Sequence, residues 1–396
     1  MKLKHGLHLA CCLGLESVAT WPEIFSALDK CVPALREQIC PRQRFGLSLS
    51  LHHRAARQLS EPPAVLAFRK WLDQHQCYVF TINGSAYGHH PAGTVKEQVY
   101  AHDWTTPERV AYTNLLFDLL ARLVPPDVPG SVSTLPASYK GFVRTPEEVK
   151  ILRNNLWRCV EHIARLGECT ERKLHLALEP APLGLLECSA ETLQFFERLR
   201  TDRRNDHRLD AHLGVNYDSC HFAVEYEEPQ NALAVLHQHG IQVSKIHVGN
   251  ALKVRPTPEA RQALAAFKED AYLHQVVVRR PDGHRVIYSD LDDALATEPK
   301  LNESQSGAEI VEWRIHSHVP LASPPMPPLA NTSDHVLGVF DWLAAHPGLC
   351  SHMEMQTYTW DTQPAELRNL SLVERLGAEY EWTVAQLAER GIGPEE

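Results

Sequence analysis

The chain alternates between two patterns of hydrophobic and polar positions. Eight short, strand-like runs lie at 5–10, 45–50, 77–84, 131–136, 174–180, 213–219, 244–250 and 352–358. Longer helical segments separate them, including 21–40, 109–124, 145–167 and 189–200. Strands separated by helices form parallel sheets, and eight such units predict an α/β fold, a (β/α)8 TIM barrel. The functional residues of such barrels lie at the carboxyl ends of the strands.

One stretch between the seventh and eighth strands departs from this rhythm. We predict within it a β-hairpin at 272–291, a polar loop at 296–309, a strand at 313–320 and a helix at 335–346. The hairpin turns at Pro281-Asp282-Gly283. We therefore expect one barrel domain over 1–396 with an insertion at 252–345. Because the insertion leaves from the carboxyl end of a strand, we expect it to cover the functional mouth.

Composition narrows the class of protein. The chain has 396 residues, is 44% hydrophobic and carries a net charge of −10, so no nucleic-acid partner is expected. No apolar run reaches the roughly 20 residues of a membrane helix, so no stable membrane insertion is expected. Ten scattered cysteines without a CxxC pair favour a reducing compartment. The N-terminus reads as a first strand rather than a signal peptide, and we expect a cytoplasmic protein.

A polar residue stands near the carboxyl end of four predicted strands. These residues are Glu179, Asp218, His247 and Glu354. If the sheet closes, they converge at one mouth, where three carboxylates would repel one another without a cation. Their oxygen and nitrogen atoms suit Mn²⁺, Mg²⁺, Co²⁺ or Zn²⁺. Two of these residues have a structural alternative to metal binding. Glu179 could cap the next helix, and His247 could be a core histidine. For Asp218 the alternative is a plain hydrogen bond with His221.

Four motifs, LALEP, NYDSCH, KIHVGNALK and MEMQTYTW, resemble the sugar epimerases of the xylose-isomerase-like barrel family. In that family a Glu, an Asp-x-x-His, a His and a Glu follow strands five to eight. The resemblance implies metal ligands at Glu179, Asp218, His247 and Glu354, with His221 holding a substrate oxygen. It also implies that Glu179 and Glu354 are catalytic. One would remove the proton beside a carbonyl and the other return it, through an enediolate that the metal stabilises.

The whole chain is similar to a narrower family, the EboE-type metabolite traffic proteins. The motifs that carry this similarity include YVFTINGSAYG, AYTNLLFDLLA, GSVSTLPASYK and WRIHSHVPL. The similarity implies a place in a metabolite biosynthesis or traffic pathway, with partners from that pathway. It leaves the reaction open.

Further substrate-binding candidates lie outside the four motif positions. Lys253 or Arg255 is expected to fill the role of the basic residue that epimerases carry after strand seven. His316 and His318 share one face of the insertion, and they either line the pocket, add a metal ligand or lie on a polar hairpin face. Asn83 begins a group that either touches substrate or forms a solvated loop; the others are Tyr87, His89, His90 and Lys96.

These observations predict a metal-dependent isomerase or epimerase that acts on a small sugar or cyclitol by proton transfer. A second hypothesis keeps the barrel and the metal but makes the protein a carrier that binds a metabolite without turnover. A third, a metal-dependent phosphodiesterase or endonuclease, is disfavoured by the acidic balance, because such barrels use a basic groove.

Overall fold

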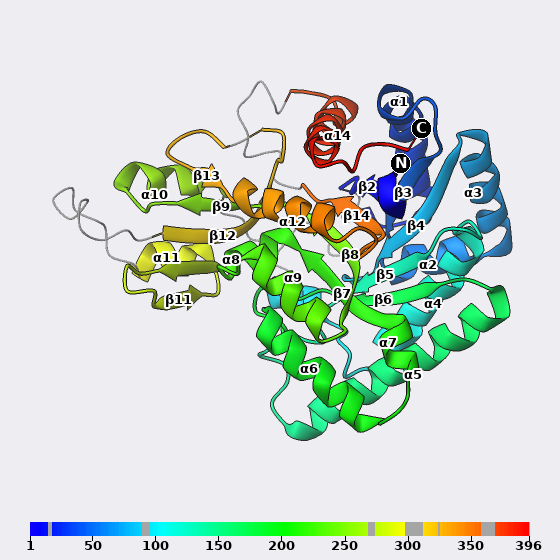
Figure 1. Ribbon diagram of the computed structural model, residues 1–396, viewed down its shortest axis with the longest axis horizontal. Coiled ribbons are helices and arrows are strands. Elements are labelled where there is room, and N and C mark those ends of the chain that lie inside the picture. Colours follow the sequence, from blue (N-terminus) through cyan, green and yellow to red (C-terminus); the bar gives the residue numbers. More distant parts are fainter. Residues whose placement is uncertain are drawn as a thin grey trace.

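The strands predicted from the hydrophobic pattern form one sheet. The computed structural model describes residues 1–14, 18–88, 96–267, 274–297, 312–323, 325–357 and 369–395. Eight parallel strands follow one another in chain order (Figure 1): β2 (Leu7–Cys11), β3 (Phe45–Ser50), β4 (Cys77–Asn83), β5 (Gly130–Thr134), β6 (Leu174–Leu178), β7 (Leu213–Asp218), β8 (Gln242–Val248) and β14 (His352–Met355). Each overlaps one of the eight predicted runs.

The sheet curls into a near-closed barrel. Hydrogen bonds join β3 through β4, β5, β6, β7, β8 and β14 to β2, and the short β1 (Lys2–Leu3) lies antiparallel beside β2. At the remaining seam, between β2 and β3, Cys12 Sγ lies 4.0 Å from Ser50 Oγ. The predicted fold class, a (β/α)8 barrel with a long insertion between strands seven and eight, is confirmed.

Helices fill the connections and cover the outside of the barrel (Figure 1). They are α1 (Trp21–Ile39), α2 (His53–Ser60), α3 (Pro62–Gln74), α4 (Pro107–Leu123), α5 (Pro146–Thr170), α6 (Ser189–Asp202), α7 (Arg208–His212), α8 (Ser219–Val224), α9 (Pro229–Gln238), α12 (Ser333–Ala345) and α14 (Leu372–Glu389), with short 3-10 turns at Lys4–Gly6, Lys96–Tyr100 and Ala265–Phe267. Thr145 and Glu148 close a capping box at the start of α5. None of the described helices is long and apolar enough to cross a membrane.

The interior of the barrel is polar, which explains the alternation in the sequence. In β3, Leu47 and Leu49 belong to the hydrophobic core, whereas Ser48 and Ser50 lie 3.5 and 3.4 Å from the amide nitrogen of Asn83. Such interiors are usually filled by bulky branched residues. Here hydrogen-bonding groups line the inside, while apolar residues pack outward.

A second sheet is built from the chain between β8 and β14. Its order is β11–β10–β12–β9–β13, with β9 (Asn250–Val254), β10 (Val276–Arg279), β11 (Arg285–Tyr288), β12 (Glu312–Val319) and β13 (Ala330–Asn331). It shares a separate core, which includes Leu252 and Trp313, with α10 (Pro258–Leu264) and α11 (Leu291–Thr297). β10 and β11 form the predicted hairpin, and Gly283 adopts a φ of +83° at its turn. Most of the predicted loop at 296–309 lies outside the described residues.

The second sheet lies on the carboxyl-end side of the barrel. Tyr226 Oη donates to the carbonyl oxygen of Glu312 at 2.8 Å, and Arg314 Nη1 donates to that of Ala223 at 2.7 Å. Ala223 lies in α8 and Tyr226 just beyond it, and α8 starts directly after β7. The insertion therefore forms one wall of the mouth (Figure 1).

Candidate metal and substrate site

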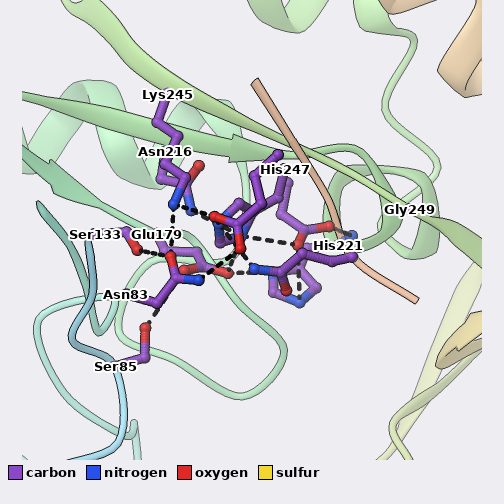
Figure 2. Close-up of polar contacts among 12 residues, drawn as sticks. Asn83, Ser85, Ser133, Glu179, Asn216, His221, Lys245, His247 and Gly249 are labelled. Atoms are coloured by element: carbon purple, nitrogen blue, oxygen red, sulfur yellow. Dashed lines mark hydrogen bonds and ion pairs between the residues drawn. The ribbon is translucent and has the colours of Figure 1, made fainter. Parts of the chain in front are cut away.

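Three strand-end residues meet at the mouth of the barrel. Glu179 follows β6, Asp218 ends β7, and His247 lies near the end of β8. His247 Nδ1 is 3.2 Å from Glu179 Oε1 and 3.6 Å from Asp218 Oδ2. The parallel register puts Asp218 beside His247, and a hydrogen bond from Glu179 N to Thr134 O continues the ladder beyond β6. Figure 2 shows Glu179, His221 and His247 converging.

The two oxygens of Asp218 have different surroundings. Oδ1 accepts from the backbone N–H groups of Cys220 and His221 at 2.8 and 3.1 Å, which caps α8. Oδ2 is buried and has no hydrogen-bond partner among the described residues. Three imidazole nitrogens surround it instead, His247 Nδ1 at 3.6 Å, His221 Nε2 at 3.7 Å and His318 Nε2 at 3.9 Å. A buried anionic oxygen without a hydrogen bond is costly unless a cation neutralises it.

Charge at this cluster is balanced by His247. Burial alone would lower the pKa of His247, but the Glu179 and Asp218 carboxylates raise it to about 10. Burial likewise opposes ionisation of Asp218, yet the imidazoles of His221, His318 and His247 hold the pKa of that carboxyl well below its usual range. A protonated imidazole therefore lies between ionised carboxylates, the place that a metal ion would take on displacing the proton.

Glu354 forms a buried ion pair with Lys245. Lys245 Nζ lies 2.5 Å from Glu354 Oε2, and both side chains are 0% exposed. Asn83 Nδ2 donates to Glu354 Oε1 at 2.8 Å, and Lys245 Nζ donates to Asn83 Oδ1 at 2.5 Å. Burial would raise the pKa of Glu354, but Lys245 holds it well below the usual range. Glu354 is thus an ionised carboxylate fixed 3.5 Å from His247 Nε2.

Three histidines line the insertion side of the mouth. The ring centroids of His221, His316 and His318 lie 4.8 to 5.4 Å from one another. His221 Nδ1 donates to the carbonyl oxygen of Pro180 at 2.9 Å, so its Nε2 is the nitrogen directed at Asp218. His316 and His318 come from β12, and the structure brings both to the wall of the mouth.

Lys253 and Arg255 are not brought to the cluster. The chain leaves the barrel after β8 and enters β9, which pairs antiparallel with β12. In β9 the Lys253 ammonium pairs with the exposed Asp334 at 3.2 Å, and Arg255 beyond it is exposed. The basic substrate residue predicted after strand seven therefore has no counterpart at these two positions.

The residues after β4 have separate surroundings. Asn83, the last residue of β4, contacts Glu354 and Lys245. Tyr87 stacks on His53 with ring centroids 4.9 Å apart, and Lys96 pairs with Asp290 of the insertion. His89 and His90 lie outside the described residues.

Sequence reasoning missed Lys245, Ser85 and Gln356. Lys245 lies two positions before His247, so the period of a strand puts both on one face, and this signal could have found it. The side-chain amide nitrogen of Gln356 lies 2.9 Å from His247 Nε2, and Ser85 Oγ donates to Glu179 Oε2 at 3.4 Å. The loop position of Ser85 carries no such signal.

Two solved structures share this architecture over nearly their whole length. An L-ribulose 3-epimerase has a TM-score of 0.52 and 11% identity, covering 99% of this chain and 96% of its own. A xylose isomerase-like TIM barrel protein from Mycobacterium smegmatis, in complex with magnesium, has a TM-score of 0.54 and 13% identity, covering 98% of both chains. The fold is xylose-isomerase-like. No protein-family model and no curated protein matches the sequence, so the EboE similarity stays a prediction.

The residues at the mouth of this xylose-isomerase-like barrel fit a divalent cation. Ligand atoms of Glu179, Asp218 and His247 all lie within 4.8 Å of one another. The buried Asp218 Oδ2, which forms no hydrogen bond among the described residues, is the observation that favours a cation over a simple hydrogen-bonded cluster. Glu354, the fourth ligand that the resemblance implied, is held at the edge of this group by Lys245.

Proposed function

We propose that this protein is a metal-dependent isomerase or epimerase of a hydroxylated carbonyl compound, a sugar or a cyclitol. The convergence of Glu179, Asp218 and His247 at the mouth, with the ionised Glu354 on the other nitrogen of His247, carries the proposal. The similarity in fold to an L-ribulose 3-epimerase and to a magnesium-bound barrel supports it. The EboE similarity adds a metabolite biosynthesis or traffic pathway, in the cytoplasm, as the proposed setting.

A divalent cation held by Glu179, Asp218 and His247 would polarise a substrate carbonyl and favour negative charge on its oxygen. Mn²⁺, Mg²⁺, Co²⁺ and Zn²⁺ remain the candidates because the set mixes two carboxylates with one imidazole. His221, with its Nδ1 fixed on Pro180, would orient a substrate hydroxyl through Nε2.

Glu179 and Glu354 are the proposed proton-transfer groups. Glu179 is 8% exposed and lies on the accessible side of the cluster, where Ser85 Oγ donates to it. Glu354 is buried, and Lys245 keeps it ionised, which a base needs before it accepts a proton. One glutamate would take the proton beside the carbonyl, and the other would return a proton to the carbon.

Incubation with ketoses and inososes in heavy water, with each cation added, tests the proposal. A true substrate should gain solvent deuterium at the carbon beside its carbonyl. Glu179→Gln keeps an oxygen for the metal but removes the base, so exchange should fall by roughly a hundred- to ten-thousand-fold. Glu161→Gln, on the outer helix α5, is the matched control and should exchange normally.

Two outcomes would contradict the proposal in different ways. Turnover without solvent label would mean a hydride shift rather than proton transfer. Tight binding of a sugar or cyclitol with neither turnover nor exchange in any cation would favour the metabolite carrier.

A further inference from the structure

We propose a second divalent-cation site beside the first, made by Asp218, His221 and His318. Its ligand atoms also lie within 4.8 Å of one another, and Asp218 would be shared by both sites. His318 belongs to the insertion, so the second site would need a residue that a simple eight-strand barrel does not contain. In this site His221 Nε2 binds the second cation, which takes the place of the direct contact with a substrate hydroxyl. The inference concerns cation binding and does not depend on the proposed reaction.

The tautomer of His221 supports this site. A carbonyl oxygen only accepts, so the 2.9 Å contact with Pro180 requires the proton on Nδ1. In the neutral ring, Nε2 then presents a lone pair to Asp218 Oδ2 at 3.7 Å, too far for a hydrogen bond. Metal-binding histidines usually donate their other N–H in this way to a carbonyl or carboxylate.

The spacing of the three side chains suits one ion. Asp218 Oδ2 lies 3.7 Å from His221 Nε2 and 3.9 Å from His318 Nε2. Two ligands about 2.1 Å from a tetrahedral ion would be roughly 3.4 Å apart, so small movements would close the site. Asp218 is 0% exposed, and its Oδ2 has no hydrogen-bond partner in the part of the chain that the structure describes.

The insertion is shaped to deliver His318. Along β12, Ile315 pairs with Leu252 and Val319 with Asn250, so three residues of β12 stand opposite one of β9. Such a bulge redirects side chains, and His318 is one of the residues within it. A Cβ at position 249 would lie 2.7 Å from His318 Nδ1, so Gly249 is what allows the ring to approach.

The ligand chemistry differs between the two sites. Two imidazoles and one carboxylate favour Zn²⁺, Co²⁺ or Fe²⁺, whereas the first site, with two carboxylates, accepts harder ions such as Mg²⁺ or Mn²⁺. His316 and Cys220 form a further group with His318 at the outer edge. His316 Nε2 is buried without a hydrogen-bond partner among the described residues, and it is available as an additional ligand.

Cation stoichiometry tests this site directly. Full-length protein stripped with a chelator is titrated with Co²⁺, with absorption and calorimetry as readouts, and Zn²⁺ content is measured after dialysis. We expect two cations per chain, one of them lost in His318→Gln with the other retained. His284→Gln, an exposed histidine at the hairpin turn, is the matched control and should retain both.

A wild-type chain that binds one cation, or a folded His318→Gln variant that still binds two, would overturn the proposal. If His318→Gln does not fold, His221→Gln must lose the same cation. Two bound cations without sugar turnover would sink the proposed reaction and leave this site standing. Solvent exchange by a chain that binds one cation would overturn the second site and support the proposed reaction.

Discussion

The two ends of the barrel both carry buried histidines, but their partners differ. At the amino end, His8 Nδ1 lies 2.7 Å from the Tyr78 hydroxyl, and His352 Nδ1 lies 2.8 Å from Ser131 Oγ. Burial lowers the pKa of His8 to about 4, and that of His352 lies well below its usual range. At the carboxyl end, carboxylates raise the pKa of His247 to about 10. The partner, and not the histidine, therefore marks the candidate site.

Charged residues also gather at the amino end of the barrel. A cavity of about 330 Å³ lies at the amino end, lined by Lys2, His8, Arg44, Tyr78, Asp127 and Glu395 among others. Its cations and anions partly pair with each other, as Lys2 does with Glu395 at 2.8 Å. Barrels of this kind carry their chemistry at the carboxyl end, where the charged groups face inward. The convergence of carboxylates on His247, rather than a cavity, is therefore the guide to the candidate site.

The largest expected effect comes from Asp218→Asn, because Asp218 belongs to both proposed cation sites. Asparagine can still cap α8, so the helix should survive the change. We expect loss of both cations and a fall in solvent exchange of more than about a thousandfold, since a bound cation contributes several kcal/mol. His8→Phe, at the other end, should keep both cations. Equal cation content in the two variants would break the comparison.

Lys245→Met should produce the next largest effect, on stability. It leaves Glu354 buried without its cation, which costs about 3–5 kcal/mol. Lys253→Met is the control, since its partner Asp334 is exposed and such pairs contribute about 1 kcal/mol or less. Urea unfolding of metal-free protein measures both variants. Equal losses would show that the Lys245–Glu354 pair does not hold the site together.

The sequence predicted the barrel well because its signal is local. A strand period of two, repeated eight times, is independent of what each strand later contacts. The same period put Glu179, Asp218 and His247 at strand ends, and it would have shown Lys245 beside His247. The direction of the chain after Gly249 had no local signal. Lys253 and Arg255 were therefore expected at a mouth from which β9 carries them away.

The positions of His316 and His318 could not be settled from the sequence for a related reason. The approach of His318 to Asp218 depends on the bulge in β12 and on the space left by Gly249, which lies 69 positions before His318 in the chain. Contacts between residues so far apart leave no periodic pattern in the sequence. The sequence therefore left both histidines between a pocket wall and a solvated face.

A pH experiment sharpens the comparison between carboxylates. Burial, and then the nearby Glu187 charge, raises the pKa of Glu225 to about 7, whereas Lys245 depresses that of Glu354. The native state therefore binds the Glu225 proton more tightly than the unfolded chain. Its contribution to stability is fully present below about pH 4.5 and is lost as the pH rises through 7, up to about 3 kcal/mol.

Glu225→Gln should remove this dependence. The variant and the wild type are unfolded in urea at several pH values, and the difference between their free energies of unfolding is compared. We expect the variant to gain about 3 kcal/mol relative to the wild type between pH 4.5 and pH 8. A difference that does not change with pH would mean that Glu225 is already ionised at low pH, as Glu354 is.

The smallest expected effect is at the amino end of the barrel. Tyr78→Phe removes the hydroxyl that lies 2.7 Å from His8 Nδ1 and should cost about 1–2 kcal/mol in the free energy of unfolding. Cation content and solvent exchange should not change, because His8 forms no hydrogen bond with a carboxylate among the described residues. Loss of a cation in Tyr78→Phe would mean that the hydroxyl-paired histidines also belong to a binding site, and that partner chemistry does not separate the two ends.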